Sequence, residues 1–177
     1  ALREWGRDLA GALFASLPPV EQRWQYRALA GKSASVNPWV LQARPSSDGV
    51  TTEFLSSLPR GEALTGTLRS PPFRIPRNLA FYIAGHRGFP DKPLTGDNFV
   101  QLIDAETGEV LARSPAPRND LAQAVAWDLT AHAGKRGHIE VTDGDEGGGY
   151  AWVAVGRFAP RLVTVPDISP DVLETRR

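Results

Sequence analysis

The feature that most constrains this fold is a series of short runs of β-forming residues between about Thr52 and Phe158. Turn-forming residues interrupt the runs about every 8 to 15 residues. The helices that would have to connect parallel strands are missing between the runs. The pattern therefore predicts two facing antiparallel sheets, a β-sandwich. The expected strands are Ala63–Arg69, Phe73–Ile75, Leu79–Ala84, Phe99–Asp104, Val110–Ser114, Gln123–Asp128, His138–Thr142 and Tyr150–Phe158.

The clearest local signal is a hairpin around the turn sequence Asp104-Ala105-Glu106-Thr107-Gly108. Leu102 and Ile103 precede this turn, and Val110 and Leu111 follow it. Two apolar runs joined by a short Gly-containing turn are typical of adjacent antiparallel strands.

The first fifty residues predict helices rather than strands. Leu2, Trp5, Leu9 and Leu13 are three or four positions apart, which predicts an amphipathic helix over residues 2–16. A second helix is expected over residues 21–30, after Pro18-Pro19 and before Gly31.

Residues 31–49 are turn-rich and are expected to form a connection. We therefore expect a helical segment and linker over residues 1–50, a sandwich over 51–160 and a linker or tail over 161–177. Two short helices cannot bury their own apolar faces, so we expect them to pack on the sandwich or on a neighbouring domain.

Composition excludes several classes of function. Lys and Arg number 20, Asp and Glu also number 20, and no block of like charge occurs. This balance argues against a nucleic-acid or membrane-surface partner, because both need a concentrated basic field. The absence of cysteine removes thiol catalysis, thiolate zinc sites and disulfides. The chain also lacks methionine and any apolar run of membrane-spanning length, so we expect a soluble piece of a longer protein.

Six segments, taken in order, resemble a known family. They are Leu64–Ile75, Leu79–Gly85, Val100–Asp104, Val125–Leu129, Gly137–Asp143 and Gly147–Tyr150. The series is similar to the galactose-binding-domain-like jelly roll, in particular to the version found in secreted fructan hydrolases and large extracytoplasmic bacterial proteins. The resemblance covers Leu58 to Phe158. It implies a mainly β, antiparallel jelly-roll sandwich, a carbohydrate-binding role and an extracytoplasmic location, periplasmic or secreted.

The candidate binding site is a pair of loops, residues 85–98 and 143–149, that converge if the jelly-roll order holds. Binding residues concentrate on loops that a rigid scaffold positions. Tyr150 and Trp152 offer a flat apolar face, although the alternation of Trp152 with Ala154 and Gly156 also fits a core position. The ligand-binding candidates are His86, Arg87, Asp97, Asn98, Asp143, Asp145, Tyr150 and Trp152.

The sequence Asp143-Gly144-Asp145-Glu146-Gly147 places three carboxylates within four residues. Clustered oxygens suit calcium, but the spacing is not that of an EF-hand, so a solvated acidic turn is the alternative. No other cofactor is expected.

Catalysis has no recognisable motif here. The chain lacks a Gly-x-Ser-x-Gly elbow, a His-Glu-x-x-His helix and a phosphate-binding glycine loop before a helix. His132 and His138 are expected to face solvent, and Trp127 to be buried at a strand end. Asp128 and Glu140 form a conceivable glycosidase pair, but any acidic sandwich contains such pairs.

The sequence thus predicts a non-catalytic, lectin-like module whose partners are a glycan and neighbouring domains, with no nucleic acid and no membrane. The alternative is a structural or interaction module without a small ligand, and a hydrolase fragment is the weaker third option. A glycan is expected to contact the loops rather than the sandwich faces. On this hypothesis Arg87→Ala, Asn98→Ala and Tyr150→Ala each weaken binding and leave stability nearly unchanged.

Overall fold

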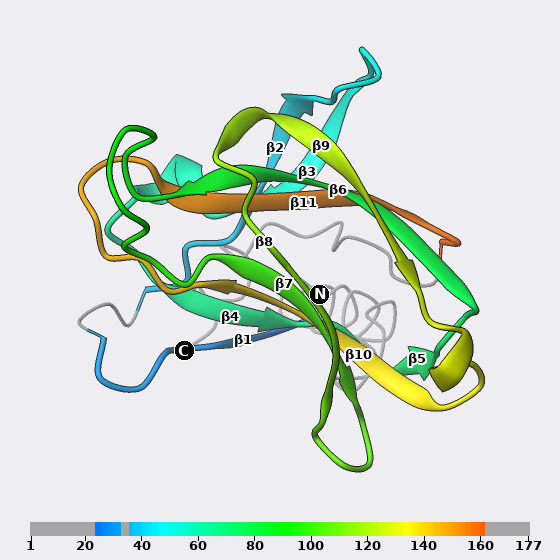
Figure 1. The fold of residues 1–177 in the computed structure, drawn as a ribbon. Helices are drawn as coiled ribbons and strands as arrows, with labels where there is room; N and C mark the ends of the chain where they lie inside the picture. Colours follow the sequence, from blue (N-terminus) through cyan, green and yellow to red (C-terminus); the bar gives the residue numbers. More distant parts are fainter. Residues whose placement is uncertain (1–23, 33–35, 162–177) are drawn as a thin grey trace, which may run out of the picture.

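The chain folds into two antiparallel β-sheets packed face to face (Figure 1). This computed structural model describes residues 24–32 and 36–161. The strands of the first sheet are β1 (Gln25–Arg27), β4 (Gly66–Arg69), β5 (Phe73–Arg74), β7 (Phe99–Asp104), β8 (Val110–Pro115) and β10 (Arg136–Asp143). The strands of the second sheet are β2 (Val40–Pro45), β3 (Thr51–Ser56), β6 (Asn78–Arg87), β9 (Asn119–Asp128) and β11 (Ala151–Ala159).

The strand order shows how the chain moves between the sheets. The first sheet runs β1-β4-β10-β7-β8, with β5 beside β10, and the second runs β2-β3-β11-β6-β9. Every ladder between these strands is antiparallel. The predicted antiparallel sandwich is therefore confirmed.

All eight predicted strands are present, and the errors lie at their ends. Runs of β-forming residues bounded by turn-forming residues located these strands. The predicted hairpin is also confirmed, since β7 and β8 pair across the turn after Asp104. The carboxylate of Asp104 accepts hydrogen bonds from the backbone N–H groups of Glu106 and Thr107, which fixes the turn.

The predicted second helix is wrong for the part of it that the structure describes. Gln25–Arg27 forms strand β1, which pairs with β4. Trp24 and Tyr26, two residues apart, both pack against the core, so a period of two prevails where we read a helical period. The described residues contain no α-helix, only the 3₁₀ turns Leu58–Arg60 and Thr130–His132. The helix predicted over residues 2–16 lies outside the described residues.

The expected connection over residues 31–49 is also wrong where it contains β2. This strand pairs with β3 along its whole length, and the hairpin tip beyond it reaches strand β9. Ser46 forms a bridge with Ala122, and the backbone N–H of Ser47 donates to the Ala122 carbonyl at 2.8 Å. The second sheet therefore curls until its first and last strands meet.

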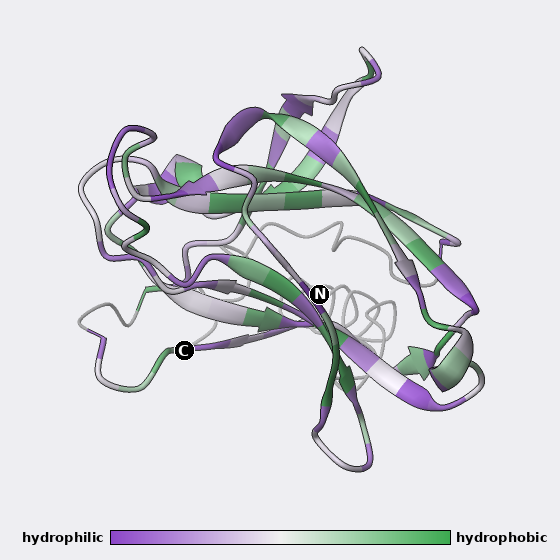
Figure 2. Cartoon of the chain, viewed as in Figure 1, coloured by the Kyte–Doolittle hydropathy of each residue, from purple (hydrophilic) through white to green (hydrophobic). Residues whose placement is uncertain are grey.

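The curl creates a second small core on the outer face of this sheet. Side chains of β11 point alternately to the two sides, so Val153 and Val155 belong to the main core between the sheets. Trp152 and Ala154 belong to the second core, together with Phe54. Figure 2 shows the resulting alternation of hydrophobic and hydrophilic residues along the strands.

The main core confirms one expectation and corrects another. Trp127 is buried, its indole N–H donates to Ser114 Oγ at 2.9 Å, and its ring meets Phe81 edge-on at 4.8 Å between centroids. His138, which we expected in solvent, is buried within β10. Its strand neighbours cover it because β10 lies in the middle of its sheet.

Gly85 is the backbone position that we expect to tolerate substitution least. Its φ is +123°, and an added Cβ would lie 2.7 Å from Val153 Cα and closer still to the Trp152 carbonyl oxygen. We expect Gly85→Ala to lower the free energy of unfolding by at least about 3 kcal/mol in chemical denaturation.

Gly108→Ala is the matched control for this substitution. Gly108 also has a positive φ, +74°, but no neighbour lies within 4 Å of an added Cβ. A cost of about 1 kcal/mol is expected there. Equal costs at the two positions would contradict the close packing of β6 against β11.

Candidate ligand-binding site

The two predicted loops meet at one end of the sandwich (Figure 1). Asn98, which is fully buried, joins them: its side-chain N–H donates to the His86 carbonyl at 2.9 Å. Its Oδ1 accepts from the backbone N–H groups of Gly144 at 2.8 Å and Asp145 at 3.2 Å. Asn98 therefore holds the loops together and is not the unpaired surface group that the sequence led us to expect.

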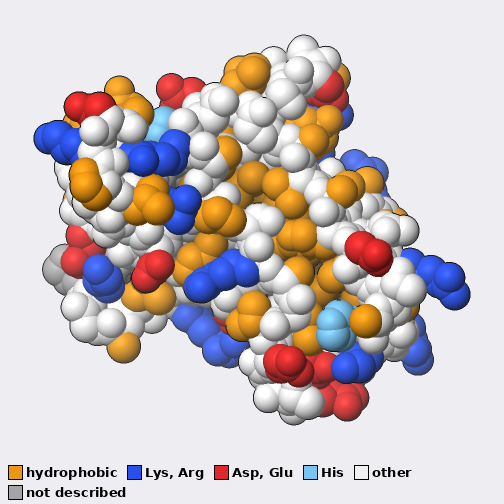
Figure 3. Space-filling model, viewed as in Figure 1, with side chains coloured by type: hydrophobic (Ala, Val, Ile, Leu, Met, Phe, Trp, Pro, Cys, Tyr) orange, Lys and Arg blue, Asp and Glu red, His pale blue; other side chains and the backbone are white. Residues whose placement is uncertain are grey.

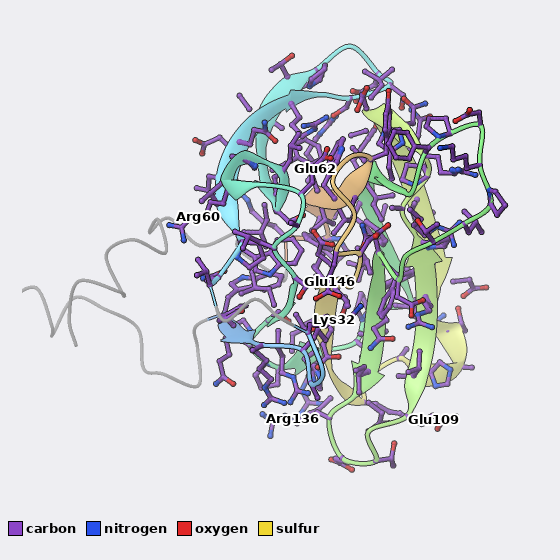
Figure 4. All side chains as sticks on the ribbon, turned by 90° about the vertical axis from the view of Figure 1, so that its left-hand side faces the viewer. Lys32, Arg60, Glu62, Glu109, Arg136 and Glu146 are labelled. Carbon is purple, nitrogen blue, oxygen red and sulfur yellow. The ribbon has the colours of Figure 1, made fainter. Side chains whose placement is uncertain are left out.

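Further hydrogen bonds fix the loop over residues 143–150. The carboxylate of Asp145 accepts from Thr95 Oγ1 at 3.3 Å and from the Gly147 N–H at 3.0 Å. The N–H of Gly88 donates to the Tyr150 carbonyl at 2.8 Å. Glu146 pairs with Lys32 at 3.3 Å, and Figure 4 shows these two side chains side by side.

Asp143 lies inside the sandwich rather than on its surface. It ends β10 on the face that carries Ile139 and Val141, and it is fully buried. Burial, helped by the charge of Asp145, raises the pKa of its carboxyl group to about 8, and contacts with Ser57, the Asp145 backbone N–H and Asn98 only partly oppose this effect. The group is therefore largely protonated at neutral pH and is a structural part of the loop base.

Trp152 and His86 form the floor beneath the loops. Trp152 is 2% exposed, and the Arg44 guanidinium lies 4.1 Å from its ring centroid, so the core alternative describes it. His86 is buried as well, with Nε2 3.2 Å from Asp120 Oδ1. The His86 ring packs edge-on against Tyr150, at 4.9 Å between centroids.

The exposed part of the site is an aromatic pair. Tyr150 is 40% exposed and Phe89 is 43% exposed, and their ring centroids are 5.2 Å apart. Our reading of the sequence missed Phe89. The signal for it was a large aromatic residue in a loop rich in polar and turn-forming residues. Among the other predicted residues, Arg87 is half-buried and Asp97 is exposed.

Two cations border the aromatic pair. The ammonium group of Lys92 lies 4.9 Å from the Phe89 ring centroid. Arg118 donates from Nη2 to the carbonyls of Phe89 and Lys92, the latter at 2.8 Å. We call Phe89, Lys92, Arg118 and Tyr150 the loop-end patch. Figure 3 shows Lys, Arg, acidic and hydrophobic side chains together over this end of the molecule.

The three carboxylates that could have formed a calcium loop do not converge. Asp143 points inward, Asp145 binds Thr95 and Gly147, and Glu146 pairs with Lys32. Within residues 24–32 and 36–161, no three acidic or histidine side chains converge on a point where an ion could bind.

The conceivable glycosidase pair is also separated. Asp128 ends β9 in the second sheet and accepts hydrogen bonds from Thr130, whereas Glu140 lies in the first sheet. Burial alone would raise the pKa of Glu140, but the nearby His138 ring and hydrogen bonds from Arg69 and Gln101 hold it at about 2. Glu140 is thus a fixed carboxylate on the outer face of the first sheet.

Comparisons with known proteins concern the fold alone. No protein-family model matches the chain, and no curated protein sequence is similar to it. The K2 cleaved adhesin domain of Lys-gingipain has a similar structure: TM-score 0.50, 13% identity, 85% of this chain and 95% of that one.

Two further solved structures are similar at lower scores. One is the C-terminal extracellular domain of Mycobacterium tuberculosis EmbC, with TM-score 0.45, 15% identity and 85% of this chain; the match spans only 61% of that chain. The other is the CBM6 domain of the laminarinase LamC from Zobellia galactanivorans, with TM-score 0.34, 16% identity, 76% of this chain and 100% of that one. No helix among the described residues has the length and hydropathy needed to span a membrane.

We expect Asn98→Ala to destabilise the fold, since it removes three hydrogen bonds and leaves the buried N–H of Gly144 without an acceptor. The expected loss in chemical denaturation is about 2–4 kcal/mol. Asp97→Ala, its exposed neighbour, is the control and should stay within about 0.5 kcal/mol of the wild type. Unchanged stability of Asn98→Ala would show that the loops are not joined here.

Asp143→Asn should change how stability depends on pH. Because the folded-state pKa is raised above the ordinary 3.8 to about 8, the wild type loses stability as pH rises across this range. The Asp143→Asn variant has no carboxyl group to ionise at this position. We therefore expect its free energy of unfolding, relative to that of the wild type, to rise by at least about 1 kcal/mol between about pH 5 and about pH 8. Denaturant midpoints at both pH values measure the gain, and parallel curves for the two proteins would refute it.

Proposed function

We propose that this domain is a non-catalytic carbohydrate-binding module and that a glycan binds at the loop-end patch. The observation that carries the proposal is the exposed pair of Phe89 and Tyr150 on two joined loops. Large aromatic side chains are seldom exposed in adjacent pairs unless they contact a partner. We also infer that the sandwich is a galactose-binding-like jelly roll.

The chemistry of the patch suits a sugar. The C–H face of a pyranose packs on an aromatic ring, and its hydroxyl groups need directional donors and acceptors nearby. Asp97, exposed in the same loop as Phe89, can supply acceptors, and the half-buried Arg87 can supply donors. Because the loops are already fixed by Asn98 and Asp145, little conformational entropy is lost when a ligand binds.

The rest of the molecule offers fewer opportunities for a sugar. Apolar side chains of both sheets fill the inner faces. The second core occupies the outer side of the second sheet. On the outer side of the first sheet, a network of hydrogen bonds from Arg69 and Gln101 to Glu140 joins the central side chains. These observations favour the loops over the faces as the glycan site.

The same network supports a non-catalytic role. A general acid at neutral pH needs a pKa close to that pH. Hydrogen bonds hold the pKa of Glu140 at about 2, so this carboxylate remains ionised and cannot donate a proton. Asp143 has a raised pKa but is enclosed by the loop base, away from the exposed aromatic pair.

We place the module in a larger extracytoplasmic bacterial protein, periplasmic or secreted. The Lys-gingipain domain, which shares the fold, is described as a cleaved adhesin domain. Within such a protein, neighbouring domains are the expected partners besides a glycan, and no role requires nucleic acid or a membrane.

A glycan array followed by titration of the best ligand tests the proposal. Tyr150→Ala and Phe89→Ala should each weaken binding by about tenfold, since each removes one ring of the stacking surface. Arg87→Ala should weaken it less. Leu94→Ala, an exposed apolar residue of the same loop, is the matched control and should bind like the wild type.

Thermal unfolding of each variant separates lost contacts from lost folding. If no glycan binds, or if binding survives both aromatic substitutions together, the proposal fails. The domain would then be a structural or interaction module that packs against a neighbouring domain.

A further inference from the structure

We propose that the loop-end patch selects anionic glycans, those that carry carboxylate or sulfate groups, and that Lys92 and Arg118 bind the negative charge. This inference rests on the proposed function and specifies its ligand class.

Lys92 lies over one ring of the aromatic pair. Its ammonium is 4.9 Å from the Phe89 ring centroid, which is itself 5.2 Å from the Tyr150 centroid. The two ring planes are tilted by 51°, so a sugar ring stacked on Tyr150 has Phe89 and Lys92 at its side. A carboxylate or sulfate on that side of the sugar is then close to the Lys92 ammonium.

Arg118 is held in place before any ligand arrives. Its Nη2 donates to the carbonyls of Phe89 and Lys92, and its backbone has a φ of +61°. Its Nε is buried and has no hydrogen-bond partner in the described part of the chain. A guanidinium group has five N–H donors in a planar fork, so donors remain for an anion. Because the Arg118 side chain is already fixed, few of its rotatable bonds lose freedom when an anion binds.

Neither cation has an acidic partner among residues 24–32 and 36–161. Elsewhere Arg69, Lys135 and Arg157 pair with carboxylates. Of the acidic residues in the adjoining loops, Asp145 is engaged by hydrogen bonds, Asp120 by His86 and Glu146 by Lys32. Asp91 and Asp97 are exposed in the same loop as Lys92, but neither forms an ion pair with Lys92 or Arg118. The loop-end patch therefore holds two cations whose charge no carboxylate of the described residues neutralises by direct pairing.

The test compares matched neutral and anionic polymers on the full chain. Binding to dextran sulfate is measured against dextran, and binding to polygalacturonate against its fully methyl-esterified form. We expect at least one anionic member to bind about tenfold or more tightly than its neutral partner, because charge-assisted hydrogen bonds are stronger than neutral ones. The sulfate and carboxylate arms distinguish the two sources of charge.

Substitutions of Lys92 and Arg118 test whether these residues bind the anionic group. The first is Lys92→Gln. It should reduce affinity for the preferred anionic polymer by about tenfold and leave the neutral partner unchanged, whereas Lys92→Arg should retain the preference. Arg118→Gln should act in the same direction, provided that its thermal midpoint shows the loop intact. Arg113→Gln is the control, since Arg113 lies 3.5 Å from the Phe99 ring centroid on the first sheet, in a comparable cation–aromatic contact.

The outcomes separate this inference from the proposed function. Neutral glycans that bind through Tyr150 with no anionic preference would leave the proposed function standing and overturn this inference. An equal loss for Lys92→Gln and Arg113→Gln would also overturn it, because it would indicate attraction to any surface cation. Absence of binding to every polymer and every arrayed glycan would overturn both.

Discussion

The loop end of this molecule depends on the buried side-chain amide of Asn98. An amide offers both donors and an acceptor, so one residue can join a carbonyl of one loop to two N–H groups of the other. In the low-dielectric interior these bonds are costly to leave unmade, and the loops are therefore confined to one arrangement. Tyr150 and Phe89 owe their close packing to this confinement, since the two rings belong to different loops.

Beneath the loops, the curl of the second sheet provides a rigid floor. Its closure depends on the β2–β3 hairpin tip, where Asp48 accepts hydrogen bonds from Tyr82 at 3.0 Å and from Arg157 at 2.8 Å. Inside the curl, Arg44 stacks on Trp152 and donates to Gln42 and to the Asp120 carbonyl. Burial lowers the pKa of Arg44, with Asp120 acting in the opposite direction. Trp152, for which the sequence favoured the core over the site, is held in the second core with the Arg44 guanidinium over its ring.

The limits of prediction from sequence follow from what periodicity encodes. Runs of β-forming residues between turns located the central strands, and the turn at Asp104 was recognisable from local hydrogen-bonding chemistry. Prediction from periodicity failed at Gln25–Arg27, where three residues are too few to separate a period of two from one of three or four. It also failed at Val40–Pro45, because this strand has no strict alternation of apolar and polar residues.

The candidate site shows a different limit. The sequence identified the loops but not which of their polar residues are buried, because burial of Asn98 and Asp143 depends on contacts between segments far apart in the chain. It likewise assigned His138 to solvent, although the neighbours of a central strand cover it. Phe89 was visible in the sequence, but only its contact with Tyr150 gives it a role.

Two carboxyl groups of β10 illustrate how far local partners decide electrostatics. Glu140 and Asp143 are both buried and three residues apart, yet the pKa of the first falls to about 2 and that of the second rises to about 8. Glu140 faces outward to Arg69, Gln101 and His138, whereas Asp143 faces inward, where no cation of the described residues pairs with it.

Their contributions to stability therefore have opposite signs. Glu140 favours the folded state above its ordinary pKa of 4.5, and this contribution is lost as pH falls through about 2. Asp143 disfavours the folded state increasingly as pH rises from 3.8 through about 8. Taken together, these two groups stabilise the sandwich most at mildly acidic pH. The loss of stability towards alkaline pH comes from the loop base, because the Asp143 carboxyl group is held among the same buried contacts that join the loops.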